Sequence, residues 1–300
     1  MNGEQVSLLG LGRMGAPIAR RLQLSLGGLT VWNRSEGKDA ALRQLGARVA
    51  ASPAEAATDT VLTVLTDLSD VEAVLYGDLG LLAGWRANGI ASPVLVVHGT
   101  VSPTGVAALA RELSAHGVSV VDAPLSGGVA GAESGALSVM VGGESQAVER
   151  VLPVLRVVGS TVVVLGGPGA GEVAKACNQV VVAATVTAVS EALVLADANG
   201  IERSLLLDVL AGGLARSEVL NQKRERWLTR DYDGGGSALN QLKDLRFVQE
   251  AAAARGVTLP LAGTLTDAFD RMVGEGLGEL DHSAIELVLS GERYASTKTG

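Results

Sequence analysis

Several residue types are scarce in this chain of 300 residues, and each scarcity limits what the protein can be. The single cysteine, Cys177, excludes an intramolecular disulfide and fits a reducing compartment. Aromatic residues make up only 3% of the chain, so alanine, valine and leucine must build the core, which favours a parallel sheet covered by closely packed helices. The three histidines (His98, His116 and His282) lie far apart in sequence, so we expect surface or structural roles for them and no metal site.

Positive charge is also scarce. Lysine and arginine together number 24 against 32 aspartates and glutamates, which gives a formal net charge of −8. Proteins that bind nucleic acid usually present a basic surface, so nucleic acid is not an expected partner. We expect no stretch long and apolar enough to span a bilayer, and the N-terminus lacks a basic region followed by an apolar signal core. The sequence therefore predicts a soluble, cytoplasmic protein without a membrane partner.

A glycine-rich turn follows the first apolar segment of the chain. Val6 to Leu9 is a short apolar run, and a helical pattern and a second apolar run (Leu29 to Trp32) come after the turn. Strand, glycine turn, helix and strand is the context that the dinucleotide fingerprint G-x-G-x-x-G requires. The first glycine permits the tight turn, the second lets a pyrophosphate approach the backbone, and the third lets the helix pack closely. We therefore predict a cofactor site at Gly10, Leu11, Gly12, Arg13, Met14 and Gly15.

The end of the second apolar run indicates which dinucleotide is bound. Sites for NAD usually place Asp or Glu here to accept a hydrogen bond from the ribose 2′-hydroxyl, whereas this chain has Asn33, Arg34 and Ser35. Arg34 can pair with a 2′-phosphate and stack on the adenine, and its two neighbours can add neutral hydrogen bonds. NADP is therefore predicted in preference to NAD. The alternative is that Arg34 is a surface arginine in a turn.

Strand-like and helix-like segments alternate up to residue 165. Helical segments are expected at 53–57, 70–76, 103–116 and 145–157, and strands at 61–65, 93–97, 118–121, 138–141 and 161–165. Such alternation predicts a doubly wound, mostly parallel sheet whose ligand lies over the carboxyl ends of the strands. The loops after those strands, with Leu65, Thr66 and Thr100, are therefore expected at the cofactor.

A second glycine-rich stretch extends from Asp122 to Gly135. Its successive glycines, Gly127 and Gly128, can direct their N–H groups into one concavity, and Ser126 adds a hydroxyl donor. This arrangement can hold a carboxylate without a full positive charge. The alternative is an ordinary glycine-rich turn.

The composition changes at Gly166 to Gly169, after which alanine-rich helical patterns continue to the end. We therefore predict two domains, residues 1–167 and 168–300, with a long helix from Gly169 to Asn199 at their junction. Lys175, Asn178 and Gln179 stand at i, i+3 and i+4 on that helix and share one face. Taken alone, Lys175 could equally be a lysine that snorkels at a helix start.

Four stretches together resemble the β-hydroxyacid dehydrogenase family, which includes 3-hydroxyisobutyrate dehydrogenase and tartronate semialdehyde reductase. They are residues 10–15, 122–143 and 169–179, and Lys243-Asp244-Leu245. The resemblance implies a Rossmann domain, an all-α C-terminal domain and an active site in the cleft between them.

The resemblance also implies roles for particular residues. Lys175 would be the general acid/base, Asn178 a positioning group, and Ser126-Gly127-Gly128 the clamp for a substrate carboxylate. Gln179 and Lys243 would lie near the substrate, Lys243 and Thr100 near the cofactor. Desolvation and a nearby Lys243 would both lower the pKa of Lys175.

The activity implied is hydride transfer between NADP(H) and the hydroxyl-bearing carbon of a small 3-hydroxy acid, or reduction of the matching semialdehyde. Two alternatives are an imine reductase and a non-catalytic dinucleotide-binding interaction protein, although known members of both kinds typically lack the lysine. Apolar stripes on the long helices predict a homodimer or homotetramer. The triple glycine Gly234 to Gly236, where relatives often carry a phenylalanine, predicts either an enlarged pocket with a loop that closes over substrate, or a surface loop that has drifted.

Overall fold

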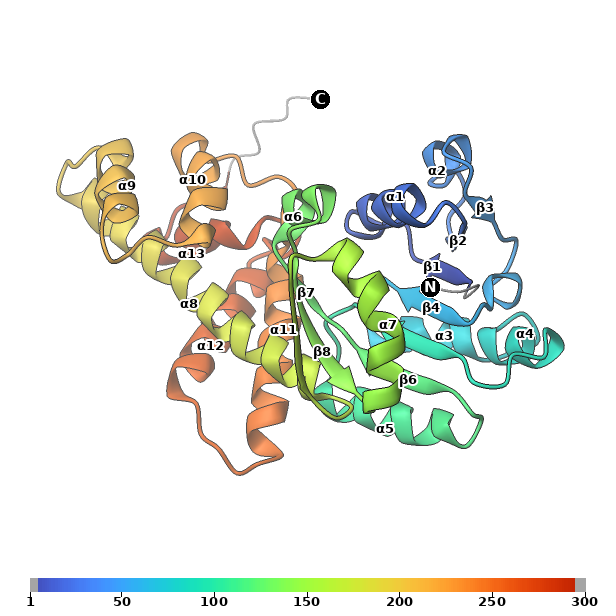
Figure 1. Ribbon diagram of the computed structural model, residues 1–300. Helices are drawn as coiled ribbons and strands as arrows, with labels where there is room; N and C mark the ends of the chain where they lie inside the picture. The colour runs from blue at the N-terminus through green and yellow to red at the C-terminus, as the bar shows by residue number, and fades with distance from the viewer. Residues whose placement is uncertain (1–4, 295–300) are drawn as a thin grey trace. The chain divides into compact units, whose positions relative to one another are not determined.

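The computed structural model describes residues 5–294 and comprises two compact units, residues 1–175 and 176–300 (Figure 1). The domain boundary predicted between residues 167 and 168 lies between the last strand, β9 (Thr161–Gly166), and the long helix α8 (Ala170–Ala198). The division into compact units falls slightly later, after Lys175. Helix α8 therefore contributes residues to both units.

A nine-stranded sheet, counted over the described residues, forms the centre of the first unit. The strand order is β3-β2-β1-β4-β5-β6-β8-β7, with β9 paired to β8, and all neighbours are parallel except that β8 runs antiparallel to β6 and β7. The strands other than β9 are β1 (Val6–Leu9), β2 (Leu29–Trp32), β3 (Arg48–Val49), β4 (Thr60–Thr63), β5 (Val94–Val97), β6 (Ser119–Asp122), β7 (Leu125–Ser126) and β8 (Ser138–Gly143). The predicted doubly wound, mostly parallel sheet is confirmed. Strand β1 pairs with both β2 and β4, so the winding reverses there.

Helices cover both faces of this sheet. They are α1 (Gly15–Leu26), α2 (Ala40–Gln44), α3 (Leu68–Leu75), α4 (Leu81–Ala87), α5 (Pro103–Ser114), α6 (Gly128–Ser134) and α7 (Ser145–Val158), with a 3₁₀ turn at Ala54–Ala56. Helices α1 and α7 share one buried cluster with the sheet, and α3, α4 and α5 share the other. Neighbouring strand residues alternate between the clusters: Leu8 belongs to the first and Leu9 to the second.

Some short elements of the first unit differ from the sequence-based expectation. The segment 53–57, expected to be helical, forms only a 3₁₀ turn, and β3, β7, α2, α4 and α6 were not anticipated. Strands β3 and β7 have two residues each, which is too short for an alternation of apolar and polar residues to be recognised in the sequence. They are strands because they pair with β2 and β8. The glycine-rich stretch after β6 contains the short strand β7 followed by helix α6.

Helix α8 has 29 residues and a mean hydropathy of 1.8 over its most apolar window, so by length and composition it could cross a membrane. The expectation that no such stretch exists was therefore wrong. Its apolar character has a second explanation, because Ala183, Val186, Val189 and Leu193 are buried in the core of the second unit. The central helix of a soluble protein meets the same criterion, so the finding is weak evidence for a membrane span.

The second unit contains only helices and one isolated β-bridge among its described residues, as expected for an all-α domain. After α8 come α9 (Arg203–Gly212), α10 (Glu218–Thr229), α11 (Ala238–Ala253), α12 (Pro260–Gly274), the 3₁₀ turn His282–Ala284 and α13 (Ile285–Ser290). The fully buried Trp227, Tyr232 and Phe269 are the largest side chains of this unit's core, which otherwise consists mainly of aliphatic residues.

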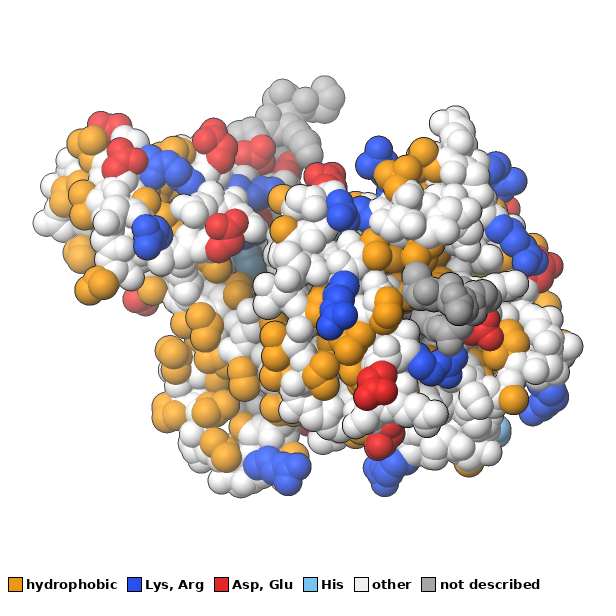
Figure 2. All heavy atoms as spheres, viewed as in Figure 1, with side chains coloured by type: hydrophobic (Ala, Val, Ile, Leu, Met, Phe, Trp, Pro, Cys, Tyr) orange, Lys and Arg blue, Asp and Glu red, His pale blue; other side chains and the backbone are white. Residues whose placement is uncertain are grey.

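Apolar side chains remain exposed on the helices of the second unit, where Figure 2 shows them in orange. On α8, Val181 and Leu195 are 65% and 67% exposed, and on α9, Leu205 and Val209 are 58% and 70% exposed. The predicted oligomer would bury exposed apolar side chains such as these between subunits. The homodimer or homotetramer itself stays a prediction.

The triple glycine has a structural explanation within the second unit. Gly235 has φ +80°, and a Cβ there would overlap the carboxylate of the buried Asp281. Gly236 donates its N–H to Asp281 Oδ2 at 3.0 Å, and His282 donates its N–H back to the Gly236 carbonyl at 2.8 Å. These hydrogen bonds attach Gly236 to Asp281 and His282, and the enlarged pocket with a loop that closes over substrate stays a prediction.

Candidate active site

The glycine turn after β1 follows the steric logic of a dinucleotide site. Gly10 has φ +99°, and a Cβ there would lie 2.5 Å from the Val64 carbonyl oxygen. A Cβ on Gly15 would overlap the Gly10 carbonyl oxygen, so neither position can accept a side chain without movement of the backbone. A Cβ on Gly12, in contrast, would meet nothing within 4 Å. Open space therefore lies next to the backbone at the position predicted to face a pyrophosphate.

The N-terminus of α1 is suited to an anion. Its N-cap residue, Met14, makes no side-chain capping hydrogen bond, and the first turn carries no acidic residue. The N–H groups of this turn and the positive end of the helix dipole are thus not neutralised by a carboxylate of the chain. Together with the open space at Gly12, this arrangement fits the pyrophosphate of a nicotinamide dinucleotide.

The residues at the end of β2 hold the glycine turn in place. Asn33 accepts a hydrogen bond from the Leu11 N–H at 2.7 Å and donates one to the Ser35 carbonyl at 2.8 Å. Asn33 is therefore a structural link between two segments predicted to bind the cofactor, a role that the sequence did not indicate. Arg34 has a largely exposed side chain and forms one loose ion pair, 3.7 Å from Asp70 Oδ1. Such a pair contributes little, so the guanidinium can reorient toward a ligand.

The loops after β4 and β5 are packed against each other. A Cβ on Gly99 would overlap the Leu65 carbonyl oxygen, which places the predicted residues Leu65 and Thr66 in one loop beside the loop that carries Thr100. Asp67 closes the first of these loops by accepting a hydrogen bond from the Leu68 N–H at the start of α3. The structure thus brings these predicted cofactor residues to the carboxyl edge of the sheet.

His98, between β5 and Thr100, is buried, as expected for a structural histidine. Its Nδ1 lies 2.7 Å from the Ala123 carbonyl oxygen, which requires Nδ1 to carry the proton and donate it. Burial lowers the pKa of His98 to about 4, although the hydrogen bond to Ala123 acts in the opposite direction. The imidazole is therefore neutral at pH 7.

The start of α8 packs against the carboxyl end of β6 and against β8. Asp122 is fully buried, and its two carboxylate oxygens accept hydrogen bonds from the N–H groups of Gly169 (2.7 Å) and Glu172 (2.9 Å). A Cβ on Gly142 would lie 2.7 Å from Asp122 Oδ1, and one on Gly171 would overlap the Met140 carbonyl oxygen. Burial raises the pKa of Asp122, while the backbone N–H donors lower it. A cap of this kind satisfies helix N–H groups that would otherwise be buried without acceptors.

Lys175 follows this cap on the same helix. Its side chain is buried, and Nζ donates a hydrogen bond to the Leu125 carbonyl at 2.8 Å. Leu125 and Ser126 form β7, and Gly127 (φ +130°) and Gly128 (φ +65°) lead directly into α6. The structure therefore brings the predicted acid/base next to the start of the predicted carboxylate clamp.

In the second unit, three further predicted residues are linked by two hydrogen bonds and an ion pair. Asn178 donates to Gln179 Oε1 at 3.0 Å, and Gln179 donates from Nε2 to Asp244 Oδ2 at 2.6 Å. Lys243 Nζ lies 3.5 Å from Asp244 Oδ1 and 5.2 Å from the centroid of the Phe247 ring. Asp244, to which no role was assigned from the sequence, thus connects Gln179 to Lys243.

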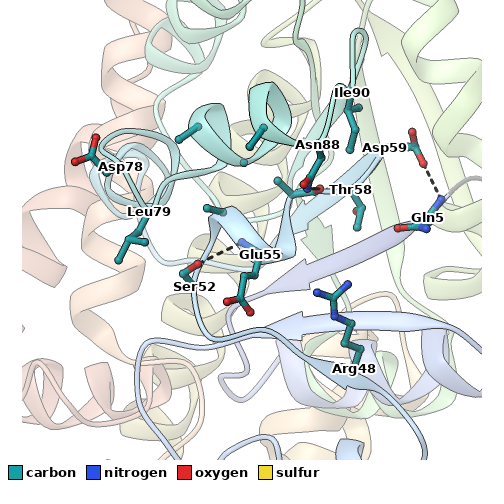
Figure 3. A pocket seen from close by; sticks show the side chains of 15 residues that line it. Gln5, Arg48, Ser52, Glu55, Thr58, Asp59, Asp78, Leu79, Asn88 and Ile90 are labelled. Carbon is teal, nitrogen blue, oxygen red and sulfur yellow. Dashed lines mark hydrogen bonds between the residues drawn. The ribbon is translucent and has the colours of Figure 1, made fainter.

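A cavity of about 800 Å³ lies elsewhere in the first unit (Figure 3). It is lined by Gln5, Thr58 and Asp59, which precede β1 and β4, and by Arg48 and Glu55. Strands β1, β3 and β4 run parallel within the sheet, so this cavity is at their amino ends, whereas the predicted cofactor residues follow the carboxyl ends of the parallel strands. No predicted site residue lines it.

Two family models cover most of the chain. Residues 5–167 match the NAD binding domain of 6-phosphogluconate dehydrogenase, and residues 169–289 match the model described as the NAD-binding domain of NADP-dependent 3-hydroxyisobutyrate dehydrogenase. With the glycine turn, the uncapped α1 and the doubly wound sheet, these matches define an NAD(P)-binding oxidoreductase with an all-α second domain.

Individual relatives narrow the class. The chain is 33% identical to the NAD-dependent L-serine dehydrogenase of Pseudomonas aeruginosa over 293 residues, covering 94% of this chain and 97% of the relative. It is also 33% identical to the 2-hydroxy-3-oxopropionate reductase of Escherichia coli, covering 94% of this chain and 95% of the relative. The crystal structure of 3-hydroxyisobutyrate dehydrogenase from Salmonella typhimurium superimposes with a TM-score of 0.85 at 30% identity, covering 95% of this chain and 99% of that one. The chain belongs to the β-hydroxyacid dehydrogenase family, and it is an NAD(P)-dependent hydroxyacid dehydrogenase or reductase.

The two glycines of the cofactor turn make a matched pair of substitutions. Gly15→Ala should lower the free energy of unfolding by about 1–3 kcal/mol, because the new methyl group must displace the backbone at Gly10. Gly12→Ala should change it by less than about 0.5 kcal/mol, since no atom lies within 4 Å of its Cβ. Gly12→Ala should nevertheless weaken dinucleotide binding. Urea unfolding and dinucleotide titration separate the two effects, and equal destabilisation by both changes would contradict this geometry.

His98 should make stability depend on pH. The folded protein holds its pKa near 4, below the ordinary value of 6.5, so the unfolded chain takes up the proton more readily. This contribution to the free energy of unfolding should therefore be complete above about pH 6.5 and fall by about 3 kcal/mol as the pH drops toward 4. Urea unfolding from pH 7 to pH 4 for the wild type and for His98→Met gives the difference. Parallel pH profiles for the two proteins would contradict the assignment.

Proposed function

We propose that the protein transfers a hydride between NADP(H) and the hydroxyl-bearing carbon of a small 3-hydroxy acid, or reduces the matching semialdehyde, with Lys175 as the general acid/base. The observation that carries the proposal is the buried Lys175, whose Nζ donates to the Leu125 carbonyl immediately before Ser126-Gly127-Gly128. Burying a cation costs free energy, and such a group commonly has a chemical task.

The dinucleotide, when bound, supplies or accepts the hydride. In the reducing direction, the ammonium group of Lys175 donates a hydrogen bond to the substrate carbonyl oxygen and then its proton to the developing alkoxide. In the oxidising direction, the neutral amine takes the hydroxyl proton as the hydride leaves carbon. Asn178 shares a helix face with Lys175, and its amide positions the substrate oxygen without added charge.

The substrate is a small carboxylate. The N–H groups of Gly127 and Gly128 and the hydroxyl of Ser126 are suited to a carboxylate, because several neutral donors share its charge. The names of the two relatives contain L-serine and 2-hydroxy-3-oxopropionate. Both compounds are three-carbon acids that carry an oxygen substituent at C3. Gln179 and Lys243, joined through Asp244, complete the proposed set of substrate residues.

The preference for NADP is supported by the end of β2. No acidic residue occurs among Asn33, Arg34 and Ser35, and the loosely paired Arg34 can form a charge-assisted contact with a 2′-phosphate. The family model matched by residues 169–289 is described as NADP-dependent, whereas the relative from Pseudomonas aeruginosa is named as NAD-dependent. Because the relatives differ in their cofactor, the proposed preference for NADP over NAD rests on the residues at the end of β2.

Lys175→Ala should remove most of kcat and leave dinucleotide binding nearly intact, because general acid–base groups typically contribute about 10²–10⁴-fold. The assay is NADPH oxidation with 2-hydroxy-3-oxopropionate and with the oxidised form of 3-hydroxyisobutyrate. A variant that keeps more than about a tenth of the wild-type rate, with chemistry limiting, would exclude Lys175 as the acid/base. Parallel assays with a cyclic imine test the alternative activity.

Arg34→Asp should weaken NADPH binding by more than about tenfold and improve NADH binding in relative terms, because one charge-assisted contact is worth roughly 1.5–3 kcal/mol. Dissociation constants for both cofactors can be measured by quenching of tryptophan fluorescence. The control is Arg43→Asp: Arg43 is another exposed arginine of the same unit, in α2, and it should leave both affinities unchanged. A wild-type protein that prefers NADH would refute the assignment.

A further inference from the structure

Glu172 is a buried carboxylate that the reaction above does not use. It lies in the first turn of α8, and its side chain is 1% exposed. Its backbone N–H is bound by Asp122, and its side-chain Oε2 accepts a hydrogen bond from the Val101 N–H at 3.2 Å. A glutamate at a helix N-terminus interacts favourably with the helix dipole, but this effect does not require burial.

The bond to Val101 reaches the loop predicted to line the nicotinamide. The Val101 N–H belongs to the peptide group that joins Thr100 to Val101, so Glu172 holds the residue immediately after Thr100. Lys175 follows Glu172 by three residues on the same helix face. One side chain therefore connects the turn that carries the proposed acid/base with the loop that carries the proposed nicotinamide contact.

The surrounding contacts make this connection stiff. Asp122 clamps Gly169 and Glu172, Lys175 is itself held at Leu125, and a Cβ on Gly169 would lie 2.8 Å from the Pro103 carbonyl oxygen at the start of α5. The hydrogen bond from Val101 attaches the β5 loop directly to this clamp, in addition to the bond between His98 and the Ala123 carbonyl. A shift of about 1 Å between reacting groups can cost on the order of 100-fold in rate.

We propose that Glu172 is a positioning residue that sets the distance between Lys175 and the Thr100 loop through its hydrogen bond from Val101. The proposal rests on the proposed function, because it assigns Lys175 the role of acid/base. It goes further in naming a residue that touches neither substrate nor cofactor. Glu172 acts only through the geometry of two other segments.

The test compares Glu172→Leu with Glu172→Gln. Leucine removes the acceptor for the Val101 N–H at similar volume, and kcat should fall about 10- to 100-fold while the dissociation constant of NADPH changes less than about threefold. Glutamine retains an acceptor oxygen and should keep more than about a third of kcat. The primary deuterium isotope effect on kcat, measured with deuterated NADPH, should rise in Glu172→Leu because hydride transfer becomes limiting.

The matched control is Glu55→Leu. Glu55 also accepts a backbone N–H, from Ala51 at 3.0 Å, but it lies at the amino ends of the strands, and its loss should leave kcat and the isotope effect unchanged. If Glu172 acts through Lys175, adding Glu172→Leu to Lys175→Ala should change the residual rate by less than about twofold.

Several results would overturn the proposal. Full kcat in a folded Glu172→Leu protein would do so, as would equal losses in the Leu and Gln variants. Should Glu172→Leu fail to fold, Glu172→Ala removes the acceptor with less steric demand, and failure of both would assign the residue to stability alone. Loss of activity in Lys175→Ala with full activity in Glu172→Leu would refute this inference and leave the proposed function intact.

Discussion

The buried carboxylate of Asp122 is the contact on which the arrangement of the first unit's site depends. It accepts the N–H groups of Gly169 and Glu172 and so attaches the start of α8 to the carboxyl end of β6. Two glycines provide the space, Gly142 on β8 and Gly171 on the helix. Because Lys175 lies one turn further along, the position of this lysine follows from the cap.

The cap is stable because it provides hydrogen-bond partners for two kinds of buried polar group. A helix that begins inside the protein has N–H groups without intrahelical partners, and a carboxylate away from water needs donors. At Asp122 each group satisfies the other. The remaining desolvation cost is visible in the raised pKa of Asp122. The same principle recurs in the second unit, where the buried Asp281 receives the N–H of Gly236 and an ion pair with Lys223.

Much of the fold could be predicted from the sequence because its patterns are local. The glycine turn between Val6 to Leu9 and α1, the alternation that builds the parallel sheet and the long apolar run of α8 all follow from periodicity and glycine positions. Helix α12 likewise begins at a proline, Pro260, which is favoured in the first turn of a helix. The two-residue strands β3 and β7 could not be predicted, because they are defined by pairing with neighbouring strands and not by a local sequence pattern.

What the sequence determined by itself was therefore the class of fold, the cofactor turn and the residue types of the candidate site, including Lys175 and Ser126 to Gly128. Only the tertiary structure decided which of the other acidic residues matter. Asp122, Glu172 and Asp244 are ordinary in sequence, and their importance comes from partners 47 to 71 positions away. Likewise, the need for glycine at position 235 comes from its close approach to the carboxylate of Asp281. The physical reason is that hydrogen bonds and steric contacts between distant segments leave no periodic trace, whereas helices, strands and tight turns do.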